Sequence, residues 1–293
     1  MVWGFTGDEL MPFGIKFAGK TEIEPGSIDE EELEDMKDRH LDAIGDKMEF
    51  LPVRVDNFDD SLDAHGIERG STILVSGGCG TGKSTFCMQS IYHGLEQGEK
   101  AVYILFEESA IKLKRHMKNN YGWDFAKYEK QGKFAMLKIN PFKIARSVEA
   151  SLLKQRRALL VQVEQLELPF VPDKIAVDSL SSLSVAFMGN SENYRYYIKH
   201  MFDSLNQYDS VNYIISETEQ DPGIYSRTGI EEFLGDGVIV LYNVKTGYTR
   251  RRAMEILKMR CCNHSKTIMP YSLTDSGIKF EKITKKDKDE SLW

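Results

Sequence analysis

The most informative segment of this chain reads Gly77-Gly78-Cys79-Gly80-Thr81-Gly82-Lys83-Ser84. It satisfies the pattern G-x-x-x-x-G-K-[ST] at every fixed position. An apolar run, Ile73 to Val75, precedes the segment, and a glycine-free run from Lys83 to His93 follows it. This strand, loop and helix predict a phosphate-binding loop, in which backbone N–H groups and the positive end of the helix hold a nucleotide's phosphates.

Two side chains at the end of this loop have distinct expected roles. Lys83 is expected to reach the β- and γ-phosphates, and the Ser84 hydroxyl is expected to hold Mg²⁺. Cys79 lies near the N-terminus of the predicted helix, a position at which thiols can be reactive. A redox switch at Cys79 is one interpretation, and a loop position that tolerates many residues is the other.

Around the loop, short β-rich runs alternate with helical runs. The predicted strands are Thr72–Ser76, Ala101–Phe106, Phe134–Ile139, Lys174–Asp178 and Val211–Ser216. The predicted helices lie near Lys83–Glu96, Ala110–Asn119, Ala145–Leu166 and Asn193–Gln207. Such alternation is typical of a parallel sheet with helices on both faces.

After Ile215 the sequence predicts no further helix. The predicted strands there are Gly237–Asn243, Ala253–Arg260, Thr267–Leu273 and Gly277–Ile283. An antiparallel extension of the same sheet is the simplest assembly. The expected fold is therefore α/β, mostly parallel, with an antiparallel C-terminal extension.

Acidic residues end two of the predicted strands. Asp178 follows the apolar run from Lys174, and in a parallel sheet ligands lie at the carboxyl ends of the strands, so Asp178 is expected to face Mg²⁺. Glu107 and Glu108 end the strand that begins at Ala101, at the same edge. One of them would orient and deprotonate the water that attacks the γ-phosphate. The alternative is a surface acidic pair that caps the next helix.

Charge is unevenly distributed along the 293 residues, whose formal net charge is −7. Residues 22 to 49 hold twelve acidic side chains against three lysines and arginines. We interpret residues 1–49 as an acidic extension, with a short helix from Ser27, that is either a charged tether or a docking surface for a partner. Residues 50–284 form the predicted catalytic domain, and residues 285–293 a charged tail.

Composition narrows the class of protein further. No uncharged apolar run is long enough to span a bilayer, and the N-terminus lacks the pattern of a signal peptide, so we expect a cytoplasmic protein. The four cysteines have neither CxxC nor zinc-ligand spacing, which argues against a disulfide framework or a structural metal. The net acidity argues against bulk binding of nucleic acid, although it leaves room for a local basic patch.

Several motifs together resemble one family. They are VSGGCGTGKST, the pair in FEES (Phe106–Ser109), YGWD from Tyr121, IAVDSLSSL, EEFLGDGVIVL (Glu231–Leu241), and LKMRCCNH (Leu257–His264) followed by TDSGI. In this order they resemble the KaiC-like branch of the RecA-type ATPases, over about residues 50 to 283. A series of motifs in register is far more specific than a phosphate loop alone.

The resemblance implies a RecA-like core, ATP and Mg²⁺ binding, and a homo-oligomeric ring, usually a hexamer, with nucleotide between subunits. By position, Glu107 and Glu108 resemble the family's paired catalytic glutamates. Lys258, Arg260 and His264 resemble residues that reach a neighbour's ATP, and residues two apart on a strand share a face. The nucleotide-binding residues implied are Gly78, Cys79, Gly80, Thr81, Gly82, Lys83, Ser84, Thr85, Lys258, Arg260 and His264, with Ser84 and Asp178 at the metal.

The chain also departs from the family pattern. DDSLDAHGIERG (Asp59–Gly70) stands where the family usually has a glycine-rich approach to the first strand, which affects the interface near Ser61–Gly66. Cys261-Cys262 replaces a small Gly-Thr pair. Glu232-Phe233 stands where the clock protein's autokinase half has Ser-Thr, so self-phosphorylation is not expected there. One phosphate loop indicates a single-domain relative.

Three functional hypotheses remain open. The first is a slow, regulatory Mg²⁺-dependent ATPase. The second is a nucleotide-gated scaffold for an unknown protein partner, similar to the KaiC-like component of the archaeal flagellar motor. The third is a DNA-dependent motor with Tyr225–Gly229 as its DNA loop, which the net acidity and the lack of a basic, glycine-rich loop disfavour.

Overall fold

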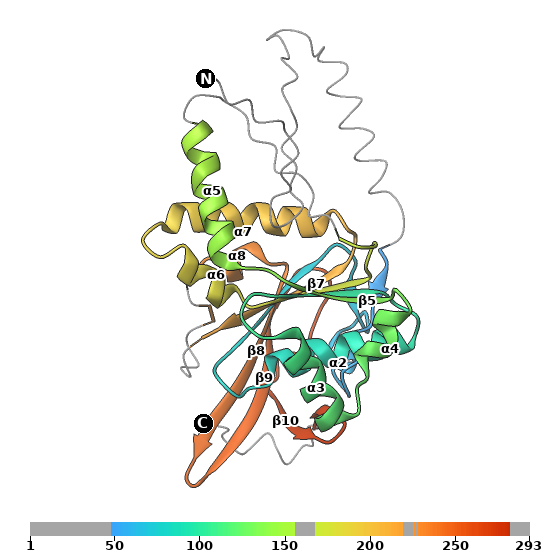
Figure 1. Ribbon diagram of the computed structural model, residues 1–293. Helices are drawn as coiled ribbons and strands as arrows, with labels where there is room; N and C mark the ends of the chain where they lie inside the picture. The colour runs from blue at the N-terminus through green and yellow to red at the C-terminus, as the bar shows by residue number, and fades with distance from the viewer. Residues whose placement is uncertain (1–47, 156–167, 219–224, 227, 282–293) are drawn as a thin grey trace, which may run out of the picture.

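A nine-stranded sheet forms the centre of the molecule, in the order β11-β10-β9-β8-β3-β7-β6-β4-β5. The computed structural model describes residues 48–155, 168–218, 225–226 and 228–281 (Figure 1). The strands from β8 to β5 in this order run parallel, whereas β9, β10 and β11 are antiparallel to their neighbours. The predicted α/β class with an antiparallel C-terminal extension is confirmed.

The strands of the large sheet agree closely with the sequence pattern. Their bounds are β3 Thr72–Gly77, β4 Ala101–Leu105, β5 Phe134–Lys138, β6 Lys174–Asp178, β7 Val211–Glu217, β8 Gly237–Thr246, β9 Thr249–Met259, β10 Met269–Thr274 and β11 Gly277–Phe280. A separate hairpin pairs β1 (Phe50–Leu51) with β2 (Ile67–Glu68). Unlike the expectation for the C-terminal strands, β8 is parallel to β3, so the antiparallel part begins only at β9.

The helices differ more from the prediction. Their bounds are α2 Lys83–Glu96, α3 Ala110–Tyr121, α4 Phe125–Lys130, α5 Pro141–Gln155, α6 Leu180–Ala186, α7 Ser191–Asn206 and α8 Glu231–Leu234. The expectation of no helix after Ile215 is wrong, because α8 forms one turn just before β8. The helix predicted over Ala145–Leu166 begins earlier, at Pro141, and its end lies outside the described residues, as does the helix predicted from Ser27.

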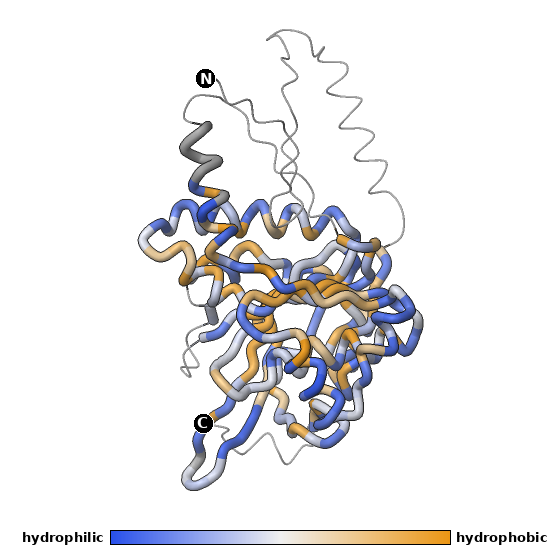
Figure 2. The backbone as a smooth tube through the Cα atoms, viewed as in Figure 1, coloured by the Kyte–Doolittle hydropathy of each residue, from blue (hydrophilic) through white to orange (hydrophobic). Residues whose placement is uncertain are grey.

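Each face of the sheet has its own apolar core, because alternate strand residues point to opposite faces. In β3, Ile73 and Val75 face α2, α3 and α4, whereas Leu74 faces α5, α6 and α7 (Figure 1). Figure 2 shows the apolar residues concentrated along the strands and inner helix faces, with polar residues outside. A sheet buried on both faces explains why its strands read as continuous apolar runs.

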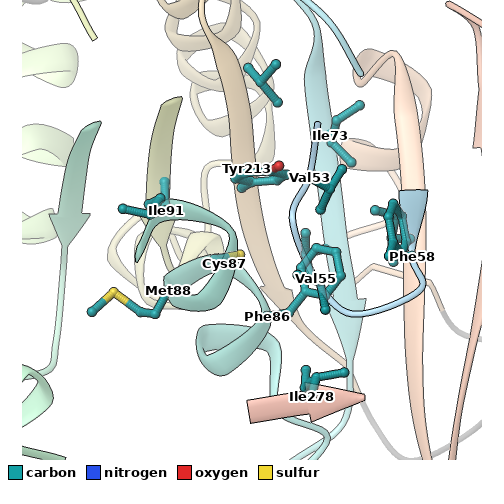
Figure 3. Close-up of a cluster of buried hydrophobic side chains, with 14 of the residues drawn as sticks. Val53, Val55, Phe58, Ile73, Phe86, Cys87, Met88, Ile91, Tyr213 and Ile278 are labelled. Atoms are coloured by element: carbon teal, nitrogen blue, oxygen red, sulfur yellow. The ribbon is translucent and has the colours of Figure 1, made fainter. Parts of the chain in front are cut away.

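The segment that precedes β3 belongs to this core. Val53, Val55 and Phe58 lie against α2 (Figure 3), and the ring centroids of Phe58 and Phe86 are 5.3 Å apart. Buried charge holds the same segment, because the Lys174 ammonium, 1% exposed, lies 3.0 Å from a Glu99 carboxylate oxygen and donates to the Pro52 carbonyl at 2.8 Å. This packing fixes the start of β3, and with it the position of the loop that follows.

Within the described part of the chain, no helix combines the length and apolar character needed to cross a membrane. The longest apolar strands are buried in the sheet instead.

Candidate functional site

The loop between β3 and α2 is shaped by glycines. A Cβ at Gly77 would lie 2.3 Å from the Leu241 carbonyl oxygen of β8, so no side chain fits there. Gly80 and Gly82 have φ values of 74° and 91°, which L residues rarely adopt. Gly82 is the N-cap of α2 and supplies no side-chain cap, so the first N–H groups of a 14-residue helix face the loop without a side-chain acceptor. This arrangement suits an anion.

Lys83 lies folded over the loop. Its buried ammonium donates to the carbonyl oxygens of Gly77 and Gly78 at 2.8 and 2.9 Å. Burial lowers the pKa of Lys83, and the charges of Glu217 and Asp178 oppose that shift. The ammonium therefore sits at the loop with nearby negative charge, in a position to exchange carbonyl partners for phosphate oxygens.

Ser84 and Asp178, the two residues predicted at the metal, are in direct contact. The Ser84 hydroxyl donates to Asp178 Oδ2 at 2.8 Å, and the Tyr103 hydroxyl donates to the same oxygen at 2.8 Å. Burial raises the pKa of Asp178, while the hydrogen bonds from Ser84 and Tyr103 oppose that shift. The structure thus joins the first turn of α2, the end of β6 and the middle of β4 through one carboxylate oxygen.

The other loop residues differ in their exposure to solvent and in their hydrogen bonds. Thr81 is buried, and its hydroxyl donates to the Gly78 carbonyl at 2.9 Å; its own carbonyl accepts a hydrogen bond from Tyr271 of β10. Cys79 is exposed at the crest of the loop, and Thr85 is buried in the first turn of α2. Hydrogen bonds to the fold thus hold the loop at Thr81, whereas Cys79 is exposed to solvent.

Glu107 and Glu108 follow β4 at the carboxyl edge of the sheet, next to the end of β6. Both side chains are exposed, and the Lys138 ammonium donates to the Glu107 carbonyl at 3.0 Å. The charge of Glu107 contributes to the raised pKa of Asp178, after the larger effect of burial. Neither glutamate contacts Asp178 through a hydrogen bond among those of the described residues.

The sequence reasoning missed two neighbours of the site. Glu217 ends β7 and lies beside Gly77 in register, with its N–H bonded to the Ser181 hydroxyl at 2.8 Å. An acidic residue at a strand end was a readable signal for Glu217, as it was for Asp178. Tyr103, in the middle of β4, gave no such signal, because its contact depends on β4 and β6 being adjacent.

Lys258 and Arg260 lie away from their own chain's loop. Lys258 pairs with Val238, which lies beside Leu74 of β3. Lys258 is therefore three residues, about 10 Å, from the loop end of that strand at Gly77. The Lys258 ammonium donates to the carbonyls of Glu232 and Gly235 at 3.2 and 2.6 Å. Burial lowers the pKa of Lys258, and the nearby charge of Arg260 adds to that shift.

The strand predicted over Ala253–Arg260 ends one residue earlier, because β9 ends at Met259 and Arg260 follows it. Its N–H donates to the Asp236 carbonyl at 2.9 Å, and its guanidinium lies 3.5 Å from the Asp236 carboxylate while remaining 58% exposed. The two cations still lie together, at the edge opposite the loop.

His264 borders the segment that approaches β3. It pairs with Leu62 in an isolated bridge, and its ring lies 2.9 Å from the Lys266 ammonium. Cys261 and Cys262 precede it, and burial, followed by the neighbouring Cys261 thiol, raises the pKa of Cys262 to about 11. The Asp59–Gly70 stretch, which departs from the family pattern, therefore contacts the residues that follow Arg260 through Ser61, Leu62 and Asp63.

Tyr225–Gly229, the candidate DNA loop, is described except for Arg227. The Ser76 hydroxyl of β3 donates to the Tyr225 carbonyl, and Thr228 donates to the buried Glu231 carboxylate at 2.6 Å. Burial would raise the pKa of Glu231, but hydrogen bonds from Thr228 and Tyr194 lower it. The two ends of this candidate loop are thus bonded to the core.

No cluster of three or more His, Cys, Asp or Glu side chains suited to a metal occurs in the described ranges. A cation at Ser84 and Asp178 would therefore need oxygen ligands from a bound phosphate chain or water, which is how Mg²⁺ is commonly held.

Comparisons with known proteins agree on one family. The family model described as "ATPase: KaiC" matches residues 51–285. The circadian clock oscillator protein KaiC of Synechococcus elongatus is 31% identical over 225 residues, 76% of this chain and 42% of that protein. The circadian clock protein KaiC3 of a Synechocystis species is 28% identical over 80% of this chain and 45% of that protein. The chain thus matches less than half the length of these relatives.

Among solved structures, the KaiC-like protein PH0186 of Pyrococcus horikoshii matches with a TM-score of 0.65 and 30% identity. The match covers 80% of this chain and all of that one. The expected resemblance is confirmed, and the chain belongs to the KaiC ATPase family.

Proposed function

We propose that this protein is a Mg²⁺-dependent ATPase with its nucleotide at the boundary between subunits. The observation that carries the proposal is the contact between Ser84 and Asp178 directly below an uncapped glycine loop. Loop amides and Lys83 would hold the triphosphate of ATP, and the Ser84 and Asp178 oxygens would hold the metal. The metal, when bound, neutralises charge on the phosphate oxygens.

Within one chain, Glu107 and Glu108 are the groups placed to act on water. They stand at the carboxyl edge, one strand from Asp178, and their exposure leaves the carboxylates accessible. A carboxylate there would accept the proton of the attacking water as the water oxygen bonds to the γ-phosphorus, while the bond from phosphorus to the β–γ bridging oxygen breaks and ADP leaves. The pair would therefore contribute to turnover more than to binding.

The two opposite edges of the sheet carry side chains of opposite charge, each beside exposed apolar residues. The carboxyl edge carries Glu107 and Glu108 beside exposed Ile111 and Phe142, 74% and 53% exposed. The other edge carries Lys258 and Arg260 near Phe233, which is 74% exposed. Two unlike, complementary surfaces favour head-to-tail contacts, which close into a ring when the rotation allows it. In such contacts the cations of one subunit approach the phosphates of the next.

Phosphate release by the full-length protein tests the proposal. We expect slow hydrolysis of ATP that needs Mg²⁺ and is lost when Lys83 is replaced by alanine, because the loop then lacks the ammonium that lies against Gly77 and Gly78. Lys279→Ala, on the exposed side of β11, is the matched control and should hydrolyse normally. Hydrolysis that persists in Lys83→Ala, or that ignores Mg²⁺, would contradict the proposal.

Tyr103→Phe tests the metal part of the site separately. The change removes one donor to Asp178 Oδ2 and leaves the aromatic ring in place, so Asp178 is held by Ser84 alone. Loss of such a supporting hydrogen bond commonly costs about ten- to a hundredfold in metal affinity. We therefore expect the Mg²⁺ concentration at half-maximal ATP binding, followed by a fluorescent ATP analogue, to rise at least about tenfold. An unchanged Mg²⁺ requirement would remove Tyr103 from the site.

A nucleotide-gated scaffold is the second candidate, and one observation favours it. The Lys258 ammonium donates hydrogen bonds to carbonyls of its own chain, so it is not free to reach a neighbour's nucleotide. Ser84 and Asp178, the residues proposed to bind the metal, are already in contact within one chain. In a scaffold, Lys83→Ala would abolish partner binding whereas Arg260→Ala would spare it. In an ATPase that signals through turnover, both variants would impair it.

A further inference from the structure

A basic surface covers the helices beside the edge strand β5. Residues 110–133 contain seven lysines and arginines and two acidic residues. Both acids are already paired, since Lys114 lies 2.6 Å from Glu129 and Lys118 lies 2.6 Å from Asp124. The remaining cations define what we call the α3–α4 basic face: Lys112, Arg115, Lys127, Lys130 and Lys133.

This face is exposed to solvent. Lys112 and Arg115 are exposed on α3, and Lys127 and Lys130 on α4, while Lys133 is half-buried at the start of β5. The Lys127 ammonium lies 5.1 Å from the centre of the Tyr128 ring, and none of the five forms an ion pair with a described carboxylate. Closely spaced like charges repel one another, so an anionic partner would stabilise this face.

The chain itself carries the complementary charge in one segment. Residues 22 to 49 have a net charge of −9, and the remainder of the chain, with 35 basic and 33 acidic side chains, is close to neutral at +2. The negative surplus that argued against polyanion binding is therefore a property of this segment and not of the folded domain.

The acidic segment enters the fold on the side of the basic face. Glu49 pairs with Arg69 at 3.3 Å, and Arg69 binds Asp173 at 2.5 Å. The Asp173 carboxylate accepts the Lys100 N–H at 2.8 Å, and the N–H of the next residue donates to the Lys133 carbonyl at 2.9 Å. A short series of contacts thus links Glu49, at the end of the acidic segment, to Lys133 of the face. Residues 29–46, if extended, would span up to about 60 Å, so reach is no obstacle.

We propose that residues 22–46 dock onto the α3–α4 basic face of the same chain. Covalent connection gives the acidic segment a local concentration in the millimolar range, so modest ion pairs suffice and an external polyanion is at a disadvantage. The contact is electrostatic and lies at the surface, so it weakens as salt shortens the Debye length from about 10 Å at 0.1 M to about 3 Å at 1 M. Docking covers a surface that would otherwise attract nucleic acid.

Zero-length cross-linking of the full chain tests this contact. A water-soluble carbodiimide joins a carboxylate to an amine only where they touch, and peptide mass spectrometry locates the amide. We expect links from acidic residues between 29 and 38 to Lys112, Lys127 or Lys130, at least fivefold fewer at 0.5 M than at 0.05 M NaCl. In a mixture of isotope-labelled and unlabelled protein, the links should stay within one label. Links that cross labels, or links confined to other lysines, would overturn the proposal.

Charge-neutralising variants supply an independent readout. Replacing Glu30, Glu31 and Glu32 with glutamine should let a labelled 30-nucleotide oligo(dT) bind at least about tenfold tighter in 0.1 M salt, because the face is uncovered. Adding Lys127→Gln and Lys130→Gln should cancel that gain.

The matched control is Lys199→Gln with Lys279→Gln, two exposed lysines outside the face, which should leave both the cross-links and the gain unchanged. Equal oligonucleotide affinity with and without the three substitutions in the acidic segment would contradict docking. If that affinity is high and depends on Lys127 and Lys130, the face is instead an open nucleic-acid site.

Discussion

Arg260→Ala should reduce the rate of ATP hydrolysis by about a thousandfold or more, the effect of losing a cation that reaches a neighbour's phosphates in related NTPases. Arg260 lies at the edge opposite its own chain's loop, 58% exposed and paired only loosely with Asp236, so its loss should disturb neither folding nor nucleotide binding by the same chain. Phosphate release and ATP binding, measured on the same preparation, check both expectations. Arg195→Ala, on the exposed side of α7, is the control.

Mixing identifies whether Arg260 acts in the neighbouring subunit. In a head-to-tail ring formed from equal parts of Arg260→Ala and the double glutamine variant described next, about a quarter of the sites combine intact glutamates with an intact arginine. The mixture should therefore recover activity that neither variant has alone. A mixture as inactive as its components would mean that Arg260 acts in the same site as the glutamates of its own chain, or takes no part in the reaction.

Glu107→Gln combined with Glu108→Gln should lower turnover by about a hundredfold or more, since a positioned general base typically contributes 10²- to 10⁴-fold. Glutamine keeps the size and polarity of each side chain but accepts no proton, and both side chains are exposed, so the fold should be unaffected. Single-turnover hydrolysis separates this loss from product release. Undiminished activity in the double variant would reject the assignment of the pair.

Two controls sharpen this second prediction. The single variants should show which glutamate dominates, and Glu192→Gln, at the exposed start of α7, should have normal activity. ATP affinity should remain within a few-fold of the unaltered protein in the double variant, because the Lys83, Ser84 and Asp178 contacts do not involve either glutamate. A parallel loss of affinity would mean that the pair holds nucleotide and does not activate water.

Much of the fold was predictable from local pattern. The bounds predicted for α2 agree with the structure, because a glycine loop and an apolar strand fix its start and Gly98 follows its end. The single turn of α8 was not predictable, since four residues carry no helical period and the turn is held by tertiary contacts. One of these is the hydrogen bond from Tyr194 of α7 to the buried Glu231 carboxylate at 2.7 Å.

Part of the candidate site was predictable from residue types at the start of a helix and at the end of a strand. Ser84 and Asp178 were expected to converge at a metal and do meet, at 2.8 Å. Tyr103 and the cross-sheet neighbour Glu217 depend on strand order, which residue spacing along one chain does not specify. The expectation that Lys258 and Arg260 lie together holds, although strand β9 ends one residue earlier than predicted.

The central claim is that the glycine loop binds ATP with Mg²⁺ through Lys83 and the Ser84–Asp178 pair. Calorimetric titration of the full-length protein with ATP in the presence of Mg²⁺ tests it most directly. The account predicts a saturable heat of binding that disappears in Lys83→Ala and weakens when EDTA removes the metal. The absence of binding heat in the unaltered protein, or an identical titration for Lys83→Ala, would contradict it.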